Sequence, residues 1–223
     1  MTRFRVSLVI EMKRIWLLIL AAALLLVSCA DGASHTFSVE EDGRYLDEDT
    51  DILYTALDDC YEASYAGEEI GRFTDEAHGV EQILYAIPDL DAALFLTDKN
   101  CDVYYAGSAP LDAALWEIDT LLVCVEVGVM NEVQNRFDAV NDPEVVGAVQ
   151  DLWFSGEDLG NVFLLETVSE RCAIKMGSAA YPNLYYAIEL RMTEEGGVYL
   201  CDKAGRRTVA LDAALAALLC EEG

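Results

Sequence analysis

The clearest pattern in the chain is the alternation of apolar and polar side chains over residues 184–193. The apolar set is Leu184, Tyr186, Ile188, Leu190 and Met192. A repeat of two residues is typical of a strand with one face buried and the other in solvent. We therefore expect a strand in which Ile188 and Leu190 point into the core, while Glu189 and Arg191 face water.

Turn residues place further strands around this segment. Glu194-Glu195-Gly196-Gly197 separates it from residues 198–202, and residues 162–167 with 172–176 form an earlier candidate pair. Together these segments predict a four-strand antiparallel meander. Residues 93–97 and 102–106 predict a separate hairpin, because they flank the turn sequence Asp-Lys-Asn-Cys.

Apolar residues recur at intervals of three and four in three shorter segments. This spacing predicts helices over residues 50–65 and 75–86, the second ending before Pro88. Residues 211–219 predict a short helix that closes the chain.

The same spacing continues from Leu111 to Val140 and predicts one long amphipathic helix, or two in line. A Val-rich strand over residues 121–127 is the alternative for part of this stretch. Asn-Asp-Pro at residues 141–143 predicts the start of another helix, which ends at Gly156.

This order of elements predicts an α+β fold, in which helices pack against an antiparallel sheet made of the hairpin plus the four-strand meander. We expect residues 51–223 to form a single globular α+β domain. The element order resembles that of PAS, GAF and Cache sensor domains. That resemblance implies a ligand cleft between the sheet and the crossing helices.

The pentapeptide Leu-Asp-Ala-Ala-Leu occurs three times, starting at Leu90, Leu111 and Leu211. Two copies follow a predicted hairpin whose second strand begins with Val-Tyr, at Val103 and Val198. The repeat is either the remnant of a duplicated strand, strand, helix unit or the result of a composition rich in Leu, Asp and Ala.

An export signal precedes these elements. Met12-Lys13-Arg14 leads into 13 consecutive apolar residues, 15–27, whereas a membrane-spanning helix needs roughly 20. Translation starts at Met1 or at Met12, which would shorten the charged region before the apolar run.

The tetrapeptide Leu26-Val27-Ser28-Cys29 resembles the lipobox of bacterial lipoproteins. The resemblance implies that residues 1–28 are a lipoprotein signal peptide, that signal peptidase II cuts before Cys29, and that the Cys29 thiol carries diacylglycerol. The alternatives are a chance Cys after an ordinary secretory signal and a short uncleaved anchor.

The charge balance favours a lipid anchor over electrostatic attachment. The 223-residue chain has 14 Lys and Arg against 41 Asp and Glu, a formal net charge of -27 at pH 7. Such a surface repels nucleic-acid phosphates and anionic lipids, so we expect no nucleic acid among its partners. The acyl chains on Cys29 would supply the attachment, at the extracytoplasmic face of the cell membrane.

Residues 29–50 are rich in Gly, Ser, Asp and Glu and predict a flexible acidic spacer. Asp47, Asp49 and Asp51 alternate like the start of a calcium loop. However, Ile52 stands where such a loop needs Gly, and Asp58 stands at the position of its closing Glu, so we expect no calcium.

Candidate catalytic and metal-binding groups are few. Neither of the two histidines, His35 and His78, lies in a catalytic motif. Six cysteines follow Cys29, without a C-x-x-C pair or a His at ligand spacing: Cys60, Cys101, Cys124, Cys172, Cys201 and Cys220. They are buried free thiols or include a disulfide. We therefore assign no catalytic, metal-binding or cofactor-binding residue.

These observations predict a lipid-anchored extracytoplasmic lipoprotein whose domain binds a small ligand or an envelope protein without turnover. The tyrosines near strand edges would either stack on a ligand or belong to the core: Tyr104, Tyr105, Tyr181, Tyr185 and Tyr186. The alternatives are a membrane-tethered hydrolase using carboxylates and a structural envelope-assembly lipoprotein. In so acidic a chain, paired carboxylates do not discriminate between them.

Overall fold

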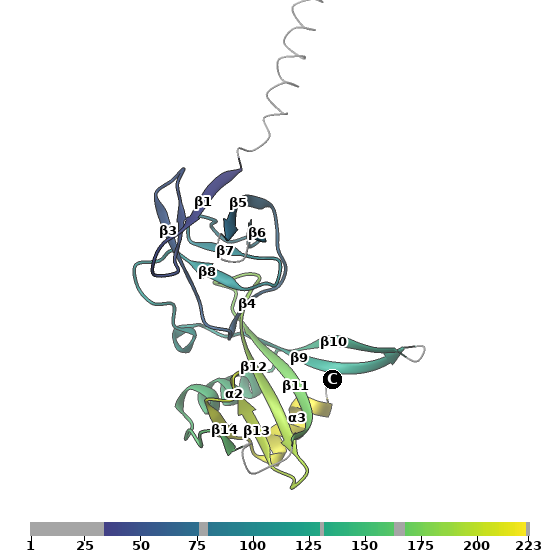
Figure 1. The fold of residues 1–223 in the computed structure, drawn as a ribbon. Helices are drawn as coiled ribbons and strands as arrows, with labels where there is room; N and C mark the ends of the chain where they lie inside the picture. The colour runs from purple at the N-terminus through teal and green to yellow at the C-terminus, as the bar shows by residue number, and fades with distance from the viewer. Residues whose placement is uncertain (1–33, 76–79, 130–131, 163–167, 222–223) are drawn as a thin grey trace, which may run out of the picture. The chain divides into compact units, whose positions relative to one another are not determined.

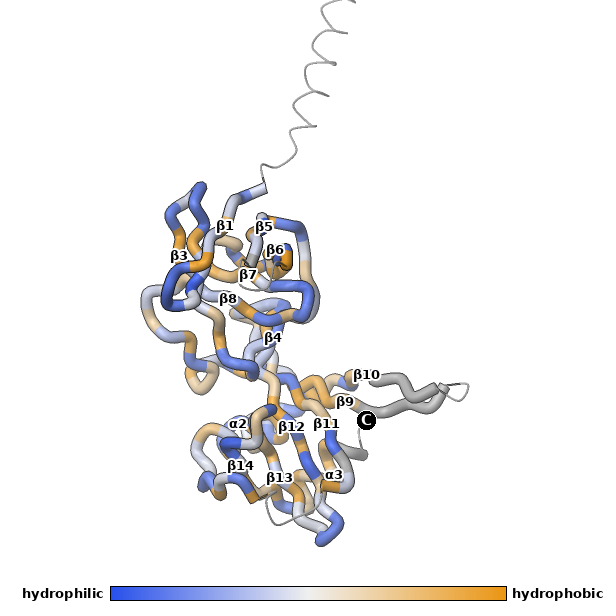
Figure 2. Tube along the Cα trace, in the orientation of Figure 1, coloured by the Kyte–Doolittle hydropathy of each residue, from blue (hydrophilic) through white to orange (hydrophobic). Residues whose placement is uncertain are grey.

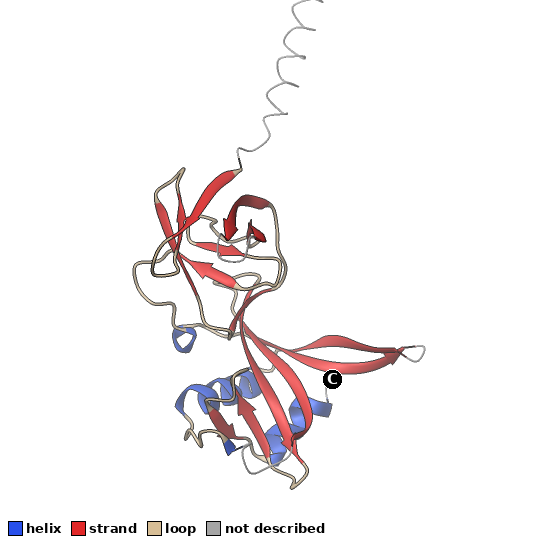
Figure 3. Cartoon of the chain, viewed as in Figure 1, coloured by secondary structure: helices blue, strands red, loops and turns tan. Residues whose placement is uncertain are grey.

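The computed structural model describes residues 34–75, 80–129, 132–162 and 168–221, and strands dominate this part of the chain (Figures 1 and 3). Among the described residues are 14 strands, two α-helices, α2 (Pro143–Ser155) and α3 (Ala213–Glu221), and a short 3₁₀ helix, η1 (Ala113–Leu115). The predicted α+β class is wrong. The fold is mostly β, and one of its two sheets closes into a barrel instead of lying open beneath helices.

Seven strands from the first half of the chain form the closed barrel, in the order β1-β2-β3-β8-β7-β6-β5. They are β1 (His35–Val39), β2 (Tyr45–Asp47), β3 (Ile52–Ala56), β5 (Glu69–Asp75), β6 (Val80–Ala86), β7 (Phe95–Thr97) and β8 (Val103–Tyr105). Neighbours pair antiparallel except β1 and β5, which are parallel. The first described strand therefore closes the barrel.

The barrel interior is filled by five buried side chains: Phe37, Tyr54, Phe73, Leu84 and Leu96. Closure requires glycine at position 71. A Cβ there would lie 2.2 Å from the carbonyl oxygen of His35 and 2.6 Å from the Phe37 ring, so β1 and β5 can approach only because residue 71 has no side chain.

The second sheet has the order β10-β9-β11-β12-β13-β14, and β4 (Tyr61–Ala63) also pairs with β12. Its other strands are β9 (Thr120–Val129), β10 (Glu132–Val140), β11 (Val168–Gly177), β12 (Leu184–Thr193), β13 (Val198–Cys201) and β14 (Thr208–Ala210). Trp153 of α2 and Leu219 of α3 share a buried cluster with Ile188 of β12. Figure 2 shows hydrophobic residues (orange) along the strands of both sheets and hydrophilic residues (blue) at several turns.

The spacer expectation does not hold from His35 onward, because β1 and β2 lie within that segment. The Gly and acidic residues of positions 40–44 form the turn between these strands, in which the Gly43 N–H donates to the Glu40 carbonyl. Strand β1 is short, and Phe37 is its one side chain in the buried cluster. One apolar residue barely changes the average composition of residues 29–50, so that average does not reveal the strand.

The helices predicted over residues 50–65 and 75–86 are also wrong, because strands β3, β4 and β6 occupy them. Leu53 and Tyr61 fit a helical spacing, yet they lie on different strands. Between these strands the Asp58 carboxylate accepts the N–H of Cys60 at 2.9 Å and forms a turn. Short apolar runs fit both the helical repeat of three to four residues and the strand repeat of two residues. Pairing with distant strands decides which structure forms.

The long helix predicted to end at Val140 is replaced by η1, β9 and β10, and the alternative strand over residues 121–127 is confirmed as part of β9. From Val123 to Val129 every second residue is Val. Such β-branched side chains favour a strand over a helix.

Other expected elements are confirmed. The predicted hairpin is β7–β8, and β12 spans the alternating segment. α2 begins at Pro143, where the Asp142 side chain caps the N–H of Glu144 at 2.9 Å, and the helix ends before Gly156. β11, β12 and β13 are strands of the predicted meander, while residues 163–167 lie outside the described part of the chain.

The three Leu-Asp-Ala-Ala-Leu copies share one capping interaction. In each copy the Asp carboxylate accepts the N–H of the second Ala, at 2.9 to 3.0 Å. The chain then forms a turn at residues 92–94, the 3₁₀ helix η1, or helix α3. Because β14 intervenes between β13 and the last copy, the repeat is better explained by shared capping chemistry than by duplication.

Candidate functional site

Two distant segments share one edge of β12. Residues 184–186 of β12 pair with β4, and residues 189–192 pair with β13. Between them the N–H of Ala187 donates to the carbonyl oxygen of Cys60 at 2.6 Å. β4 and β13 therefore follow one another along β12 and meet at a junction near Ala187.

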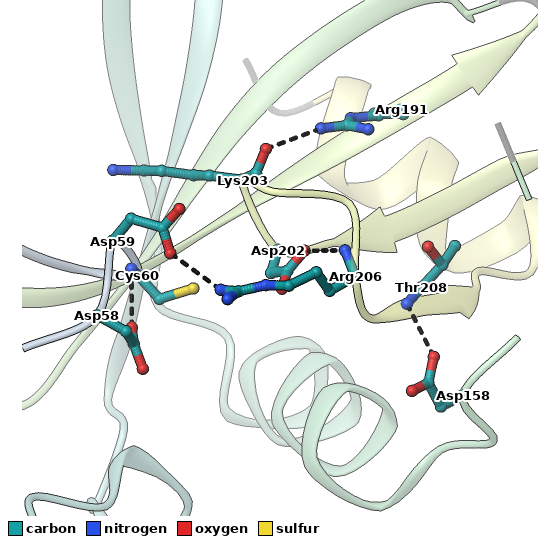
Figure 4. Close-up of polar contacts among 9 residues, drawn as sticks. All are labelled: Asp58, Asp59, Cys60, Asp158, Arg191, Asp202, Lys203, Arg206 and Thr208. Atoms are coloured by element: carbon teal, nitrogen blue, oxygen red, sulfur yellow. Dashed lines mark hydrogen bonds and ion pairs between the residues drawn. The ribbon is translucent and has the colours of Figure 1, made fainter. Parts of the chain in front are cut away.

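Charged side chains surround this junction, and we call them the seam cluster: Asp59, Glu62, Lys175, Asp202, Lys203 and Arg206. The Arg206 guanidinium lies 3.3 Å from Asp202 and 3.4 Å from Asp59 (Figure 4). Lys175 Nζ lies 2.7 Å from Glu62 Oε2, and Lys203 donates to the other oxygen of that carboxylate. The cluster thus sets three cations against three carboxylates.

The environment of Glu62 keeps its carboxylate ionised. Burial raises the pKa of Glu62, but hydrogen bonds and charge from Lys175 and Lys203 outweigh burial and hold the pKa below its ordinary 4.5. A general acid at neutral pH needs the opposite shift. Glu62 is therefore suited to joining two strands and unsuited to proton donation.

The face of β12 that was expected to be solvated is partly covered. Arg191 is only 7% exposed. Its guanidinium lies 2.7 Å from Glu189. It also donates to the Lys203 carbonyl oxygen at 3.3 Å (Figure 4). Ile188 and Leu190 are buried as predicted, so the alternation is correct for the core face. On the other face, the turn after β13 covers Arg191. The sequence of β12 alone does not reveal this contact.

The thiols at and near the junction are protonated at neutral pH. Burial raises the pKa of Cys60 to about 11, with a further rise from Asp58, and burial raises that of Cys201 to about 12. Burial also raises the pKa of Cys101. Thiols of this kind are poor nucleophiles.

None of the five cysteines whose side chains the structure describes forms a disulfide. They are Cys60, Cys101, Cys124, Cys172 and Cys201. The Cys172 thiol donates to the carbonyl oxygen of Cys124 at 2.7 Å. Of these five, Cys60 and Cys201 are buried as expected, whereas Cys101, Cys124 and Cys172 are half-buried. The side chain of Cys220 lies outside the described set.

Most of the tyrosines proposed as a stacking surface pack on other rings. Tyr181 stacks on Trp116 with ring centroids 4.7 Å apart, and Tyr186 meets Tyr61 edge-on at 5.2 Å. Tyr105 packs on Phe95, and Tyr104 on Tyr45, each at 4.9 Å. The core interpretation is therefore the one that fits these four tyrosines. Tyr185 is half-buried near Lys175, whose Nζ lies 6.0 Å from the ring centroid.

Many aspartates form turns. Nine accept the N–H of the residue two positions later, a local bond that fixes a turn or caps the start of a helix. They are Asp42, Asp47, Asp58, Asp91, Asp98, Asp112, Asp142, Asp158 and Asp212. The acidity that suggested a carboxylate-dependent hydrolase thus has a structural use at these positions.

His35 contacts Asp47, the first of the three alternating aspartates. His35 Nδ1 lies 2.6 Å from Asp47 Oδ2. Asp47 is 2% exposed and also accepts the Thr50 hydroxyl at 2.7 Å and the Asp49 N–H at 3.0 Å. Burial raises the pKa of Asp47, but these hydrogen bonds outweigh it and hold the pKa below its ordinary 3.8. His78 lies outside the described residues.

A two-stranded arm leaves the second sheet. β9 and β10 pair over nine residue pairs, whereas β11 pairs with β9 only at residues 120–123. Residues 124–129 of β9 therefore pair with β10 alone within the described structure, and we call residues 124–129 and 132–137 the arm (Figure 1). At its base, Lys175 Nζ lies 5.0 Å from the centroid of the Phe137 ring.

Cys29, the predicted lipidation site, lies outside the described residues. Among those described, no helix combines the length and the apolar character that crossing a bilayer requires. No family model matches the sequence, and no curated protein or solved structure matches it either.

Sequence reasoning missed the residues that the fold brings together. Glu62 meets Lys203 across 141 positions and Lys175 across more than one hundred, and no local motif signals either contact. Asp47 did carry a signal, the alternation with Asp49 and Asp51, but no local pattern indicates that His35 lies beside it.

Proposed function

We propose that this protein is a lipid-anchored extracytoplasmic lipoprotein whose folded part binds a protein partner without turnover. The arm supports the proposal that this protein binds a partner. Within the described structure, the outer edges of its two strands have no neighbouring strand. The motif that carries the anchoring part is Leu26-Val27-Ser28-Cys29.

An isolated pair of strands is at best marginally stable in water. Its unpaired N–H and C=O groups offer a template on which an extended segment of another protein can add a strand. Every second residue from Val123 to Val129 is Val, a residue that favours such pairing. A partner that covers the arm would supply the contacts that the rest of the sheet does not.

The polar groups elsewhere favour binding over catalysis. The charges of the seam cluster neutralise one another, and the thiols of Cys60 and Cys201 are held protonated by burial. Nine aspartates form turns or cap helices. No observation favours the hydrolase alternative over these structural uses.

Site-specific photo-crosslinking in cell membranes tests the binding role. A photoreactive residue replaces Arg136, which is exposed on the arm, and in a second variant Ala204, which is exposed in the turn after β13. We expect a discrete protein adduct from position 136 that is absent from position 204. The absence of any adduct at 136, or the same adducts at both positions, would contradict a binding role for the arm.

The anchoring part is tested separately with Cys29→Ala. We expect this variant to lose fatty-acid labelling and to leave the membrane fraction, because only the Cys29 thiol takes diacylglycerol under this proposal. Metabolic labelling followed by fractionation gives both readouts, and Cys220→Ala serves as a matched control. Undiminished labelling of Cys29→Ala would exclude the lipid anchor.

A further inference from the structure

We propose that His35, Asp47 and Asp49 form a binding site for a divalent transition-metal ion such as Zn²⁺ or Co²⁺. One atom from each side chain can act as a ligand, and the three atoms lie within 4.8 Å of one another. Ligand atoms around an ion bound at about 2.1 Å are separated by roughly 3 to 4 Å, so small side-chain movements complete the site.

The buried carboxylate is the first argument for a cation. Asp47 is 2% exposed, yet within the described residues it pairs with no Lys or Arg, only with an imidazole whose side chain is 34% exposed. Buried charges are normally paired or bound to metal ions. Asp49 adds a second carboxylate from the exposed side, so the two acids together match the charge of a divalent ion.

The backbone holds these ligands in place before any ion arrives. His35 pairs with Gly71 where β1 closes the barrel, and Asp47 pairs with Phe37 at the end of β2. Thr36 donates its N–H to Asp49 at 2.8 Å. Three ligands from two paired strands and the turn that follows are therefore fixed by the barrel itself, which lowers the entropic cost of binding.

The donor set favours a transition metal over calcium. An imidazole nitrogen with carboxylate oxygens suits Zn²⁺, Co²⁺ and related ions, whereas Ca²⁺ takes six to eight oxygen ligands. His35 Nδ1 and Asp47 Oδ2 lie 2.6 Å apart and are hydrogen-bonded. An ion bound by both atoms would replace this hydrogen bond, with the imidazole proton on Nε2.

Titration of the full-length chain in detergent with Co²⁺ and with Zn²⁺ tests the site. Calorimetry gives the affinity for both ions, and the visible absorption of Co²⁺ reports its ligands. We expect one site per chain with nitrogen and oxygen ligation, without the intense near-ultraviolet band of cobalt thiolates. We also expect saturating Zn²⁺ to raise the Tm.

Matched variants locate the site. His35→Gln and Asp49→Asn should each weaken binding on the order of tenfold or more. Asp51→Asn, in the same turn, and His78→Gln, the second histidine, should leave binding unchanged. The Tm of each variant in metal-free buffer shows that it is folded, so a loss of affinity can be assigned to the missing ligand.

Three outcomes would overturn the proposal. They are the absence of saturable binding by the wild type, equal affinity in His35→Gln and His78→Gln, and a thiolate band showing that the ion binds cysteine. The first would leave His35 and Asp47 as a hydrogen-bonded pair that joins β1 to β2.

Discussion

Asp47 and Glu62 are carboxylates whose pKa values lie below their ordinary 3.8 and 4.5, because hydrogen bonds from their partners outweigh the effect of burial. A group with a lowered pKa in the folded state stabilises the fold above its unfolded pKa, and this stabilisation is lost as the pH falls through the folded pKa. We expect the free energy of unfolding to decrease as the pH falls below these ordinary values.

Urea unfolding at a series of pH values measures this loss. Asp47→Asn and Glu62→Gln should lower stability at neutral pH and each flatten the acid limb of the pH profile. Glu48→Gln, at an exposed carboxylate, should leave the profile unchanged. An acid limb as steep in both variants as in the wild type would show that other groups control acid unfolding.

The two faces of β12 give a second residue-level prediction. Ile188 is buried, so Ile188→Asp should cost several kcal/mol, on the order of the marginal stability of a domain. Arg191→Ala should cost about 1 to 3 kcal/mol, because Glu189 and the Lys203 carbonyl lose their buried donor.

Arg171 provides the control, since it lies opposite Arg191 on β11 and is exposed. Arg171→Ala should change stability by less than about 0.5 kcal/mol. Thermal unfolding of the three variants ranks them, and equal effects at Arg171 and Arg191 would show that the cover over β12 contributes little.

At the scale of elements, the Asp cap of α3 has a measurable effect. Asp212 accepts the N–H groups of Ala214 and Leu215, both at 2.9 Å. Asp212→Ala should therefore destabilise the protein by about 1 kcal/mol, whereas Asp212→Asn keeps the capping oxygen and should cost only a few tenths. Chemical unfolding distinguishes the two, and an equally large loss in both would assign the effect to charge instead of capping.

Helices and strands were predictable where a single local sequence pattern determines the element. Asp142 followed by Pro143 marked the start of α2, and the strict alternation marked β12. The prediction failed where apolar residues fitted two repeats, as in β3, β4 and β9, because pairing with distant strands chose the repeat. Barrel closure was out of reach, since it depends on the parallel contact of His35 with Gly71.

The candidate functional residues were predictable only in part, because several of them meet through pairing between distant strands. The lipobox is a contiguous motif, so Cys29 stands as a proposal from four adjacent residues. His35 and Asp47 are 12 positions apart and meet only because β1 pairs with β2. The contacts of Glu62 require β4 and the turn after β13 to lie along one strand.

For the whole molecule, closure of the barrel by its first described strand leads to a further prediction. Deleting residues 35–47 should abolish cooperative unfolding of the barrel, because it removes β1, which closes the barrel, together with β2. Deleting residues 31–33 should leave the unfolding transition unchanged. Calorimetry compares the two, and an intact transition after the longer deletion would exclude closure by β1.

The arrangement of strands along β12 also constrains how the chain reaches its native state. Glu62, on β4, finds Lys203 across 141 positions, so this part of the second sheet cannot form until most of the chain has been synthesised. The barrel strands lie within the first half and can pair earlier. Closing so long a loop slows folding more than it lowers stability. During this delay β4 can bridge to Asp102 through Glu62, but the edge of β4 that later pairs with β12 is uncovered, so this edge is exposed to pairing with other chains.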